Sequence, residues 1–153
     1  MFVNVDLDST QGEWFPFFSS HIDPGTGEPI YDEPEKDARV QIRSIGPFIE
    51  ERMAKRKKVF ENIFNPKSRG MERMGFYPEP SYEEMRAERD DLWDYAITGI
   101  ENFKDSKTGD LITCTRENKL KLMKVPVFDR FVARCQQLLA SSGVKAKEDE
   151  EKN

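Results

Sequence analysis

The chain has 153 residues, a length typical of one domain that can bury about two-thirds of its unfolded surface. Charged residues make up 35% of it and aromatic residues 11%, which favours a compact core of large side chains inside a charged shell over disorder. The formal net charge of -5 argues against a general nucleic-acid binder, because such a protein carries a basic face. The two cysteines are too few for a disulfide scaffold.

Residues 2–45 are predicted to form a small antiparallel β-sheet. Apolar and polar residues alternate over Val3–Leu7 and Ala38–Ile45, the pattern of a strand with one buried face. The aromatic segment Glu13–Ser19 is also strand-like. Pro16 cannot donate a backbone hydrogen bond, so this strand is expected at a sheet edge or with a bulge.

Two hairpins are predicted. The sequence Asp23–Glu28 favours a tight turn, because proline sets φ and glycine tolerates positive φ. This turn joins His21–Ile22 to Pro29–Tyr31. A minor hairpin is expected over Ile100–Cys114, around the polar turn Asp105–Asp110.

Four helices are predicted, near residues 47–64, 81–98, 116–124 and 126–141. In the first, Ile49, Met53 and Phe60 fall on one helical stripe. Ser81 opens a capping box with Glu84. The other ends are marked by an N-cap candidate, a first-turn proline and two glycines, at Thr115, Pro126, Gly99 and Gly143. Residues 71–77 (MERMGFY) fit a short strand or a helical turn.

The predicted fold is therefore a single α+β domain over residues 1–143, with a β-rich part at 1–45 and a mainly helical part at 46–143. Residues 144–153 (VKAKEDEEKN) lack periodicity and are predicted to be a disordered charged tail. No secretory signal and no apolar run of roughly 20 residues is present, so we expect neither secretion nor a membrane span.

No residue pattern indicates catalysis, a metal or a cofactor. One histidine and two cysteines give no recognisable ligand spacing. Cys114 and Cys135 have no base close in sequence, which favours buried, unreactive thiols. The acids between Glu83 and Asp94 are expected on a solvated helix face. The basic cluster Lys55–Lys58 is balanced by nearby glutamates, and we predict no nucleic-acid contact.

Exposed aromatic side chains would instead mark a protein-binding surface. The run Trp14–Phe18 has more aromatic residues than one strand face can bury. Core packing is the alternative interpretation for this run and for the helical stripes. The candidate partner-binding residues are Trp14, Phe17, Phe18, Phe60, Phe64, Phe128 and Phe131.

The stretch from Trp93 to Phe131 resembles the tail assembly chaperones of long-tailed bacteriophages. The matching features follow one another along the chain: Ile100–Phe103, Thr108–Asp110, Leu111–Thr115, Glu117–Leu122 and Pro126–Phe131. The sequence WFPF, the PGTGE turn and the strand Arg39–Arg43 before a helix are similar to proteins of this family as well.

The resemblance implies a function. Such chaperones act in the host bacterial cytoplasm without catalysis or cofactors. They bind the tape measure protein, keep it soluble, help recruit the tail tube protein and are absent from the mature virion. Self-association is a further expectation. In many phages a frameshift appends a second domain, and Val144–Asn153 would lie at that junction.

Two other functions compete with this prediction. A structural virion protein, such as a minor tail or connector component, would have the same composition and fold class. An enzyme, such as a metal-dependent hydrolase, would have to use the acids between Glu83 and Asp94.

Overall fold

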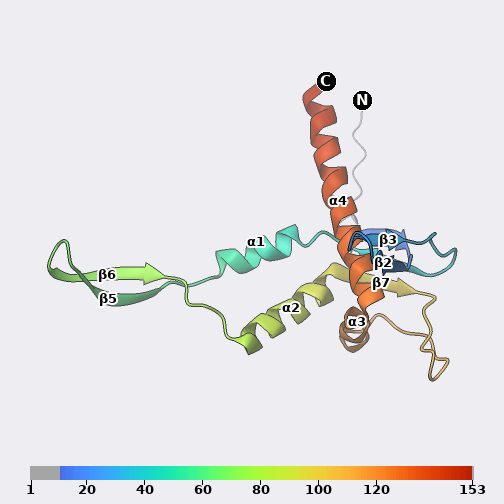
Figure 1. Cartoon of the computed structure of the whole chain (residues 1–153), viewed down its shortest axis with the longest axis horizontal. Helices are drawn as coiled ribbons and strands as arrows, with labels where there is room; N and C mark the ends of the chain where they lie inside the picture. Colours follow the sequence, from blue (N-terminus) through green and yellow to red (C-terminus); the bar gives the residue numbers. More distant parts are fainter. Residues whose placement is uncertain (1–10, 153) are drawn as a thin grey trace. The chain divides into compact units, whose positions relative to one another are not determined.

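The protein has an α+β fold, as predicted, in a computed structural model that describes residues 11–152, with side chains to residue 141 (Figure 1). The predicted strand Val3–Leu7 lies outside the described residues. Contacts divide the chain into two compact units, where the sequence predicted one domain. Unit 1 holds the residues up to Ile45 and from Asp90 onward, and unit 2 is Gly46–Arg89.

A three-stranded antiparallel sheet lies at the centre of unit 1. Its strands are β1 (Glu13–Pro16), β4 (Arg39–Ile42) and β7 (Ile97–Glu101), in the order β1-β4-β7. Of the two alternatives predicted for the strand with Pro16, the edge position is correct, since β1 pairs only with β4 among the described strands. The sequence did not predict β7 as the third strand of this sheet, because β7 lies in the second half of the chain, far from β1 and β4.

The predicted hairpin at residues 21–31 is confirmed as β2 (Ser20–Ile22) paired with β3 (Pro29–Tyr31). The carboxylate of Asp23 organises its turn. It accepts hydrogen bonds from the backbone N–H of Gly25 at 3.1 Å and the Thr26 hydroxyl at 3.0 Å. Chiefly the first of these bonds lowers the pKa of Asp23 below its usual value.

The helices α3 (Arg116–Met123) and α4 (Pro126–Lys152) follow in unit 1. The predicted cap is confirmed, because the Thr115 side chain accepts a hydrogen bond from the Asn118 N–H. The predicted end of the last helix at Gly143 is wrong, since α4 continues through it to Lys152. One glycine costs a helix only about 1 kcal/mol, and the lysines, glutamates and alanine that follow favour helix. The tail predicted to be disordered is therefore helical up to Lys152.

Helix α2 (Tyr82–Ala96) begins as predicted, because the Ser81 hydroxyl accepts a hydrogen bond from the Glu84 N–H at 3.1 Å. It ends before Gly99, which lies inside β7 instead of capping the helix. The minor hairpin that follows is smaller than predicted. Beyond β7, its ladder is reduced to one antiparallel bridge between Lys104 and Leu111.

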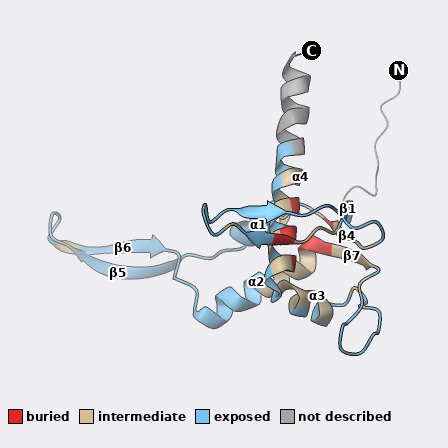
Figure 2. Ribbon diagram, turned by 45° about the vertical axis from the view of Figure 1, so that its right-hand side comes forward, coloured by how far each residue is buried: buried red, intermediate tan, exposed pale blue. Residues whose placement is uncertain are grey.

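The core of unit 1 forms where α4 crosses the sheet (Figures 1 and 2). The strands contribute Val40, Ile42 and Ile97, and α4 contributes Phe128, Phe131, Val132 and Cys135. All seven side chains are almost fully buried. The alternation predicted for Ala38–Ile45 is thus confirmed at Val40 and Ile42, and the predicted apolar stripe of the last helix faces the sheet.

Unit 2 contains α1 (Gly46–Ala54), β5 (Val59–Asn65), β6 (Gly70–Phe76) and the first half of α2. The helix predicted at 47–64 is therefore wrong after Ala54. Apolar residues spaced by four fit a helix stripe, but adjacent apolar pairs also fit a strand that carries apolar residues on both faces. The antiparallel partner β6 decides in favour of the strand.

A four-residue turn joins β5 to β6. The Asn65 side chain accepts a hydrogen bond from the Lys67 N–H at 3.0 Å, and Arg69 adopts a positive φ of 53°. The strand interpretation of residues 71–77 is correct for Met71–Phe76, and the sheet contains only β5 and β6 among the described strands.

Phe131 is the largest fully buried side chain of the core, and its truncation measures what α4 contributes. We expect Phe131→Ala to lower the free energy of unfolding of unit 1 by about 3–5 kcal/mol, because it leaves a cavity. Urea unfolding followed by tryptophan fluorescence reports on unit 1, since both tryptophans, Trp14 and Trp93, lie there.

The matched control is Leu111→Ala, because Leu111 is 63% exposed. This change should stay within about 0.5 kcal/mol of the original chain. Equal losses for the two variants would contradict the description of Phe131 as the centre of the core.

Candidate protein-binding surface

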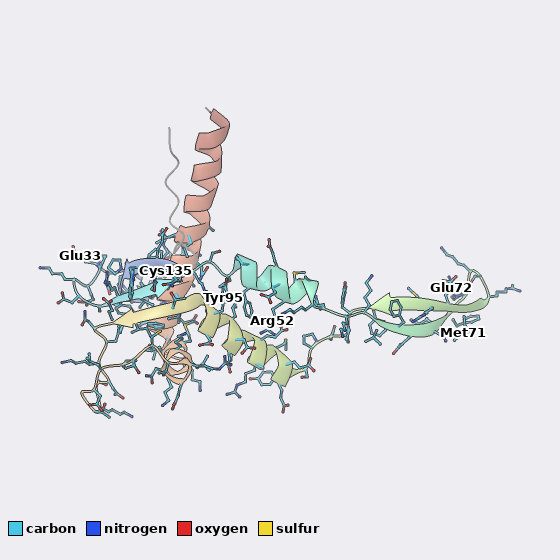
Figure 3. All side chains as sticks on the ribbon, turned by 180° about the vertical axis from the view of Figure 1, so that it is seen from behind. Glu33, Arg52, Met71, Glu72, Tyr95 and Cys135 are labelled. Carbon is cyan, nitrogen blue, oxygen red and sulfur yellow. The ribbon has the colours of Figure 1, made fainter. Side chains whose placement is uncertain are left out.

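Strands β5 and β6 form a ribbon whose side chains alternate between two faces. Cross-strand partners share a face, so the register assigns each side chain to one side. We call basic face the side formed by Phe60, Asn62, Phe64, Met71, Arg73 and Gly75. We call acidic face the side formed by Val59, Glu61, Ile63, Glu72, Met74 and Phe76. Figure 3 shows the neighbouring Met71 and Glu72 side chains on opposite sides of the ribbon.

Large apolar side chains are exposed on both faces. On the basic face Phe60 is 52% exposed, Phe64 57% and Met71 64%. On the acidic face the exposed apolar residues are Val59, Ile63, Met74 and Phe76. Full burial of one such side chain stabilises a complex by about 1.5–3 kcal/mol, so a partner that covers either face would gain affinity from apolar contact.

Phe60 and Arg73 form the centre of the basic face. The Arg73 guanidinium carbon lies 4.5 Å from the centroid of the Phe60 ring, a cation–π contact. The same ring lies over Gly75, since a Cβ added at Gly75 would come within 2.7 Å of Phe60 Cε1. The glycine lets the ring lie against the strand, which fixes an aromatic platform beside a cation.

The same kind of contact, a cation above an aromatic ring, also occurs at the base of the ribbon. Tyr77 follows β6, and the Arg56 guanidinium carbon lies 4.8 Å from the centroid of its ring. The Lys58 ammonium nitrogen lies 5.7 Å from the same centroid. Lys58 also lies on the side of Phe60, because both side chains approach Gly75. The ribbon and its base therefore repeat one arrangement, an exposed aromatic ring with a cation above it.

Within Gly46–Arg89, all of which the structure describes, no residue is buried (Figure 2). The helical residues of this unit also expose apolar side chains, at Ile49, Met53, Tyr82 and Met85. A two-stranded hairpin alone is marginally stable in water. Unit 2 thus contains many large apolar side chains but has no apolar core of its own.

Two other predicted partner-binding residues, Phe128 and Phe131, are not at the surface. They are 2% and 1% exposed and belong to the core of unit 1. The alternative interpretation, core packing, is correct for these two positions. The apolar stripe Phe128–Leu139 packs on the sheet.

Phe17 and Phe18 are half-buried and also pack on the core. The Phe17 ring centroid lies 5.1 Å from that of Phe131 and 5.2 Å from that of Phe103, both edge-to-face. The Phe18 ring meets Phe131 in the same way at 4.9 Å. These edge-to-face contacts stabilise unit 1, so the two rings contribute mainly to core packing.

Trp14 lies on the sheet face opposite the core residues of β4. It pairs across the sheet with Gln41, and a Cβ added at Gly99 would come within 2.6 Å of its indole ring. The Arg39 guanidinium carbon lies 4.4 Å from the Trp14 ring centroid. Trp14 is 37% exposed, so the indole covers the sheet and still presents an edge to solvent.

The structure thus brings together only Phe60 and Phe64 of the seven predicted residues on one exposed ribbon. Sequence reasoning missed Met71, Arg73 and Tyr77, which complete the basic face and its base. The signal was present in MERMGFY, whose alternation fits the strand interpretation. Pairing this segment with residues 59–65 would have assigned the faces.

The thiols show no activation for catalysis. Burial raises the pKa of Cys135 to about 12, and burial is also the main cause of the raised pKa of Cys114. A nucleophilic cysteine requires the opposite shift. His21 lies in unit 1's β2–β3 hairpin, with Nδ1 3.8 Å from Asp32 Oδ1.

Two of the acids of α2 that lie in unit 1, Asp91 and Asp94, are paired with cations. The Arg116 guanidinium contacts Asp91 at 2.8 Å and Asp94 at 3.3 Å. Lys119, which is nearly buried, contacts Asp94 Oδ1 at 3.1 Å and donates to its backbone carbonyl at 3.0 Å. These ion pairs join α2 to α3. Among the described residues, no group of three or more histidine, cysteine, aspartate or glutamate side chains is arranged to hold a metal.

In the part of the chain that the structure describes, none of the helices combines the length and apolar character needed to cross a membrane. Comparison with known proteins adds no relative: no family model, no curated protein and no solved structure matches this chain. The family resemblance of Trp93–Phe131 therefore stays a prediction.

The burial of the two thiols predicts a difference in alkylation. With iodoacetamide at about pH 8, Cys114 should be labelled first and Cys135 only very slowly, because its thiolate is scarce and covered. Peptide mass spectrometry over a time course measures both rates, and both thiols should react together in guanidinium chloride. Equal native rates would mean that α4 leaves the sheet readily.

Proposed function

We propose that this protein is a phage tail assembly chaperone that binds the tape measure protein and keeps it soluble during tail assembly. The single observation that carries the proposal is the β5–β6 ribbon, whose apolar side chains are exposed on both faces. Contiguous exposed apolar surface on a charged protein marks a protein-interaction site. The resemblance of Trp93–Phe131 supplies the identity of the partner.

The division into two units suits this function. Unit 1 has a closed core and presents charged side chains to solvent, which favours solubility of the complex. Unit 2 offers uncovered apolar surface that can take up a hydrophobic partner. In this proposal the chain acts by binding alone in the host bacterial cytoplasm. It recruits the tail tube protein at a later stage and leaves before the virion is complete.

Co-expression with the tape measure protein tests the proposal. We expect a soluble complex that survives purification under native conditions, because the ribbon shields apolar segments of the partner. The double variant Phe60→Ser with Phe64→Ser should lose the complex or weaken it at least about tenfold, since it removes two large apolar contacts.

Leu111→Ser is the matched control, because it removes an apolar side chain of similar exposure from unit 1; it should leave the complex intact. No co-purification of the unmodified chain would refute the proposal. Mass spectrometry of purified virions separates the chaperone from a structural component, which would be present in the particles.

A further inference from the structure

The two faces of the β5–β6 ribbon carry opposite charges. Both acids of the two strands, Glu61 and Glu72, lie on the acidic face. Arg73 lies on the basic face, and no acidic residue of either strand accompanies it. The segment 55–77 as a whole has seven basic residues and two acidic ones, although the complete chain is acidic. The basic face therefore combines apolar surface with local positive charge.

The basic face also has the size of one helix. Each strand has seven residues, so the ribbon is about 23 Å long at roughly 3.4 Å per residue. Two strands about 4.8 Å apart give a platform about 10 Å wide, which equals the diameter of an α-helix with its side chains. A helix of about 15 residues has the same length.

We propose that the basic face binds an acidic amphipathic α-helix of the partner protein; this inference rests on the proposed function and specifies the chemistry of the bound segment. Apolar residues on one stripe of that helix contact Phe60, Phe64 and Met71. Carboxylates beside the stripe pair with Arg73 near the middle of the ribbon, and with Lys58 and Arg56 at its base. A helix laid on an apolar platform is an established mode of peptide recognition.

A basic face with aromatic rings could also accept single-stranded nucleic acid, whose bases stack on such rings. Two features favour a helix. The uncharged residues of the face include Met71 beside the two phenylalanines, and the net charge of -5 opposes approach to a phosphate backbone. Single-stranded DNA therefore enters the experiment as a competing probe.

The experiment uses the full-length protein and two synthetic peptides of about 15 residues. Both have leucine at helical positions i, i+3, i+4 and i+7, while their remaining positions carry glutamate in one peptide and lysine in the other. Fluorescence anisotropy measures binding at low salt. We expect the acidic peptide to bind at least about tenfold more tightly than the basic one, with the preference decreasing as salt screens the charges.

Two neighbouring residues of β6 provide matched variants, because they lie on opposite faces. Arg73→Glu should weaken binding of the acidic peptide roughly three- to tenfold. Glu72→Arg adds a positive charge one residue away on the acidic face and should change the affinity less than about twofold. Far-UV circular dichroism, which includes the signal of the β5–β6 ribbon, confirms that both variants remain folded.

Equal affinity for the two peptides, no binding of either, an equal effect of the two variants, or tighter binding of a single-stranded DNA of about 15 nucleotides would each overturn the inference. The proposed function fails on a different measurement. A soluble complex with the tape measure protein but no preference for the acidic peptide refutes only the inference that the basic face binds an acidic helix. A peptide preference without that complex refutes only the identity of the partner.

Discussion

The packing of α4 on β4 and β7 is the interaction on which unit 1 depends. Strand β4 contributes Val40 and Ile42 and lies between β1 and β7 in the sheet. Helix α4 closes this sheet with Phe131 at the centre, and Phe17 and Phe18 fill the edge of the contact with aromatic rings. Because β7 and α4 come from the second half of the chain, unit 1 forms only when distant parts of the sequence meet. Outside this core, the buried end of Lys119 and the Arg116 pairs with Asp91 and Asp94 fasten α2 to α3.

Unit 2 follows the opposite principle. Its residues are rich in large apolar side chains, yet none is buried. The phenylalanines that sequence analysis treated alike are therefore divided by the fold: Phe128 and Phe131 stabilise unit 1, whereas Phe60 and Phe64 remain open to a partner. Apolar side chains that are not buried in a core can bind another protein. Their position on a narrow ribbon limits the shape of the segment that they can bind.

The sequence predicted the elements that depend on local chemistry. The caps at Ser81 and Thr115, the turn at Asp23 and the alternation around Val40 are each decided within a few residues, and all are confirmed. The prediction failed where one sequence pattern fits two kinds of secondary structure. Val59, Phe60, Ile63 and Phe64 fit a helix and a two-sided strand equally well, and only pairing with β6 selects the strand. Likewise Gly99 fits a helix end, but the Trp14 ring above it requires a residue without Cβ in β7. Only part of the site was predicted, Phe60 and Phe64, because the tertiary structure decides which apolar residues remain exposed.

The lack of buried residues in unit 2 also has a consequence for the lifetime of the protein in a cell. Segments without a core open at low cost in free energy, and opened segments are the ones that proteases cleave. A covered ribbon would be protected, whereas an uncovered one would be degraded first. With the proposed partner, the turnover rate of the chain would follow the supply of that partner, and the amounts of the two proteins would become matched without a separate regulator.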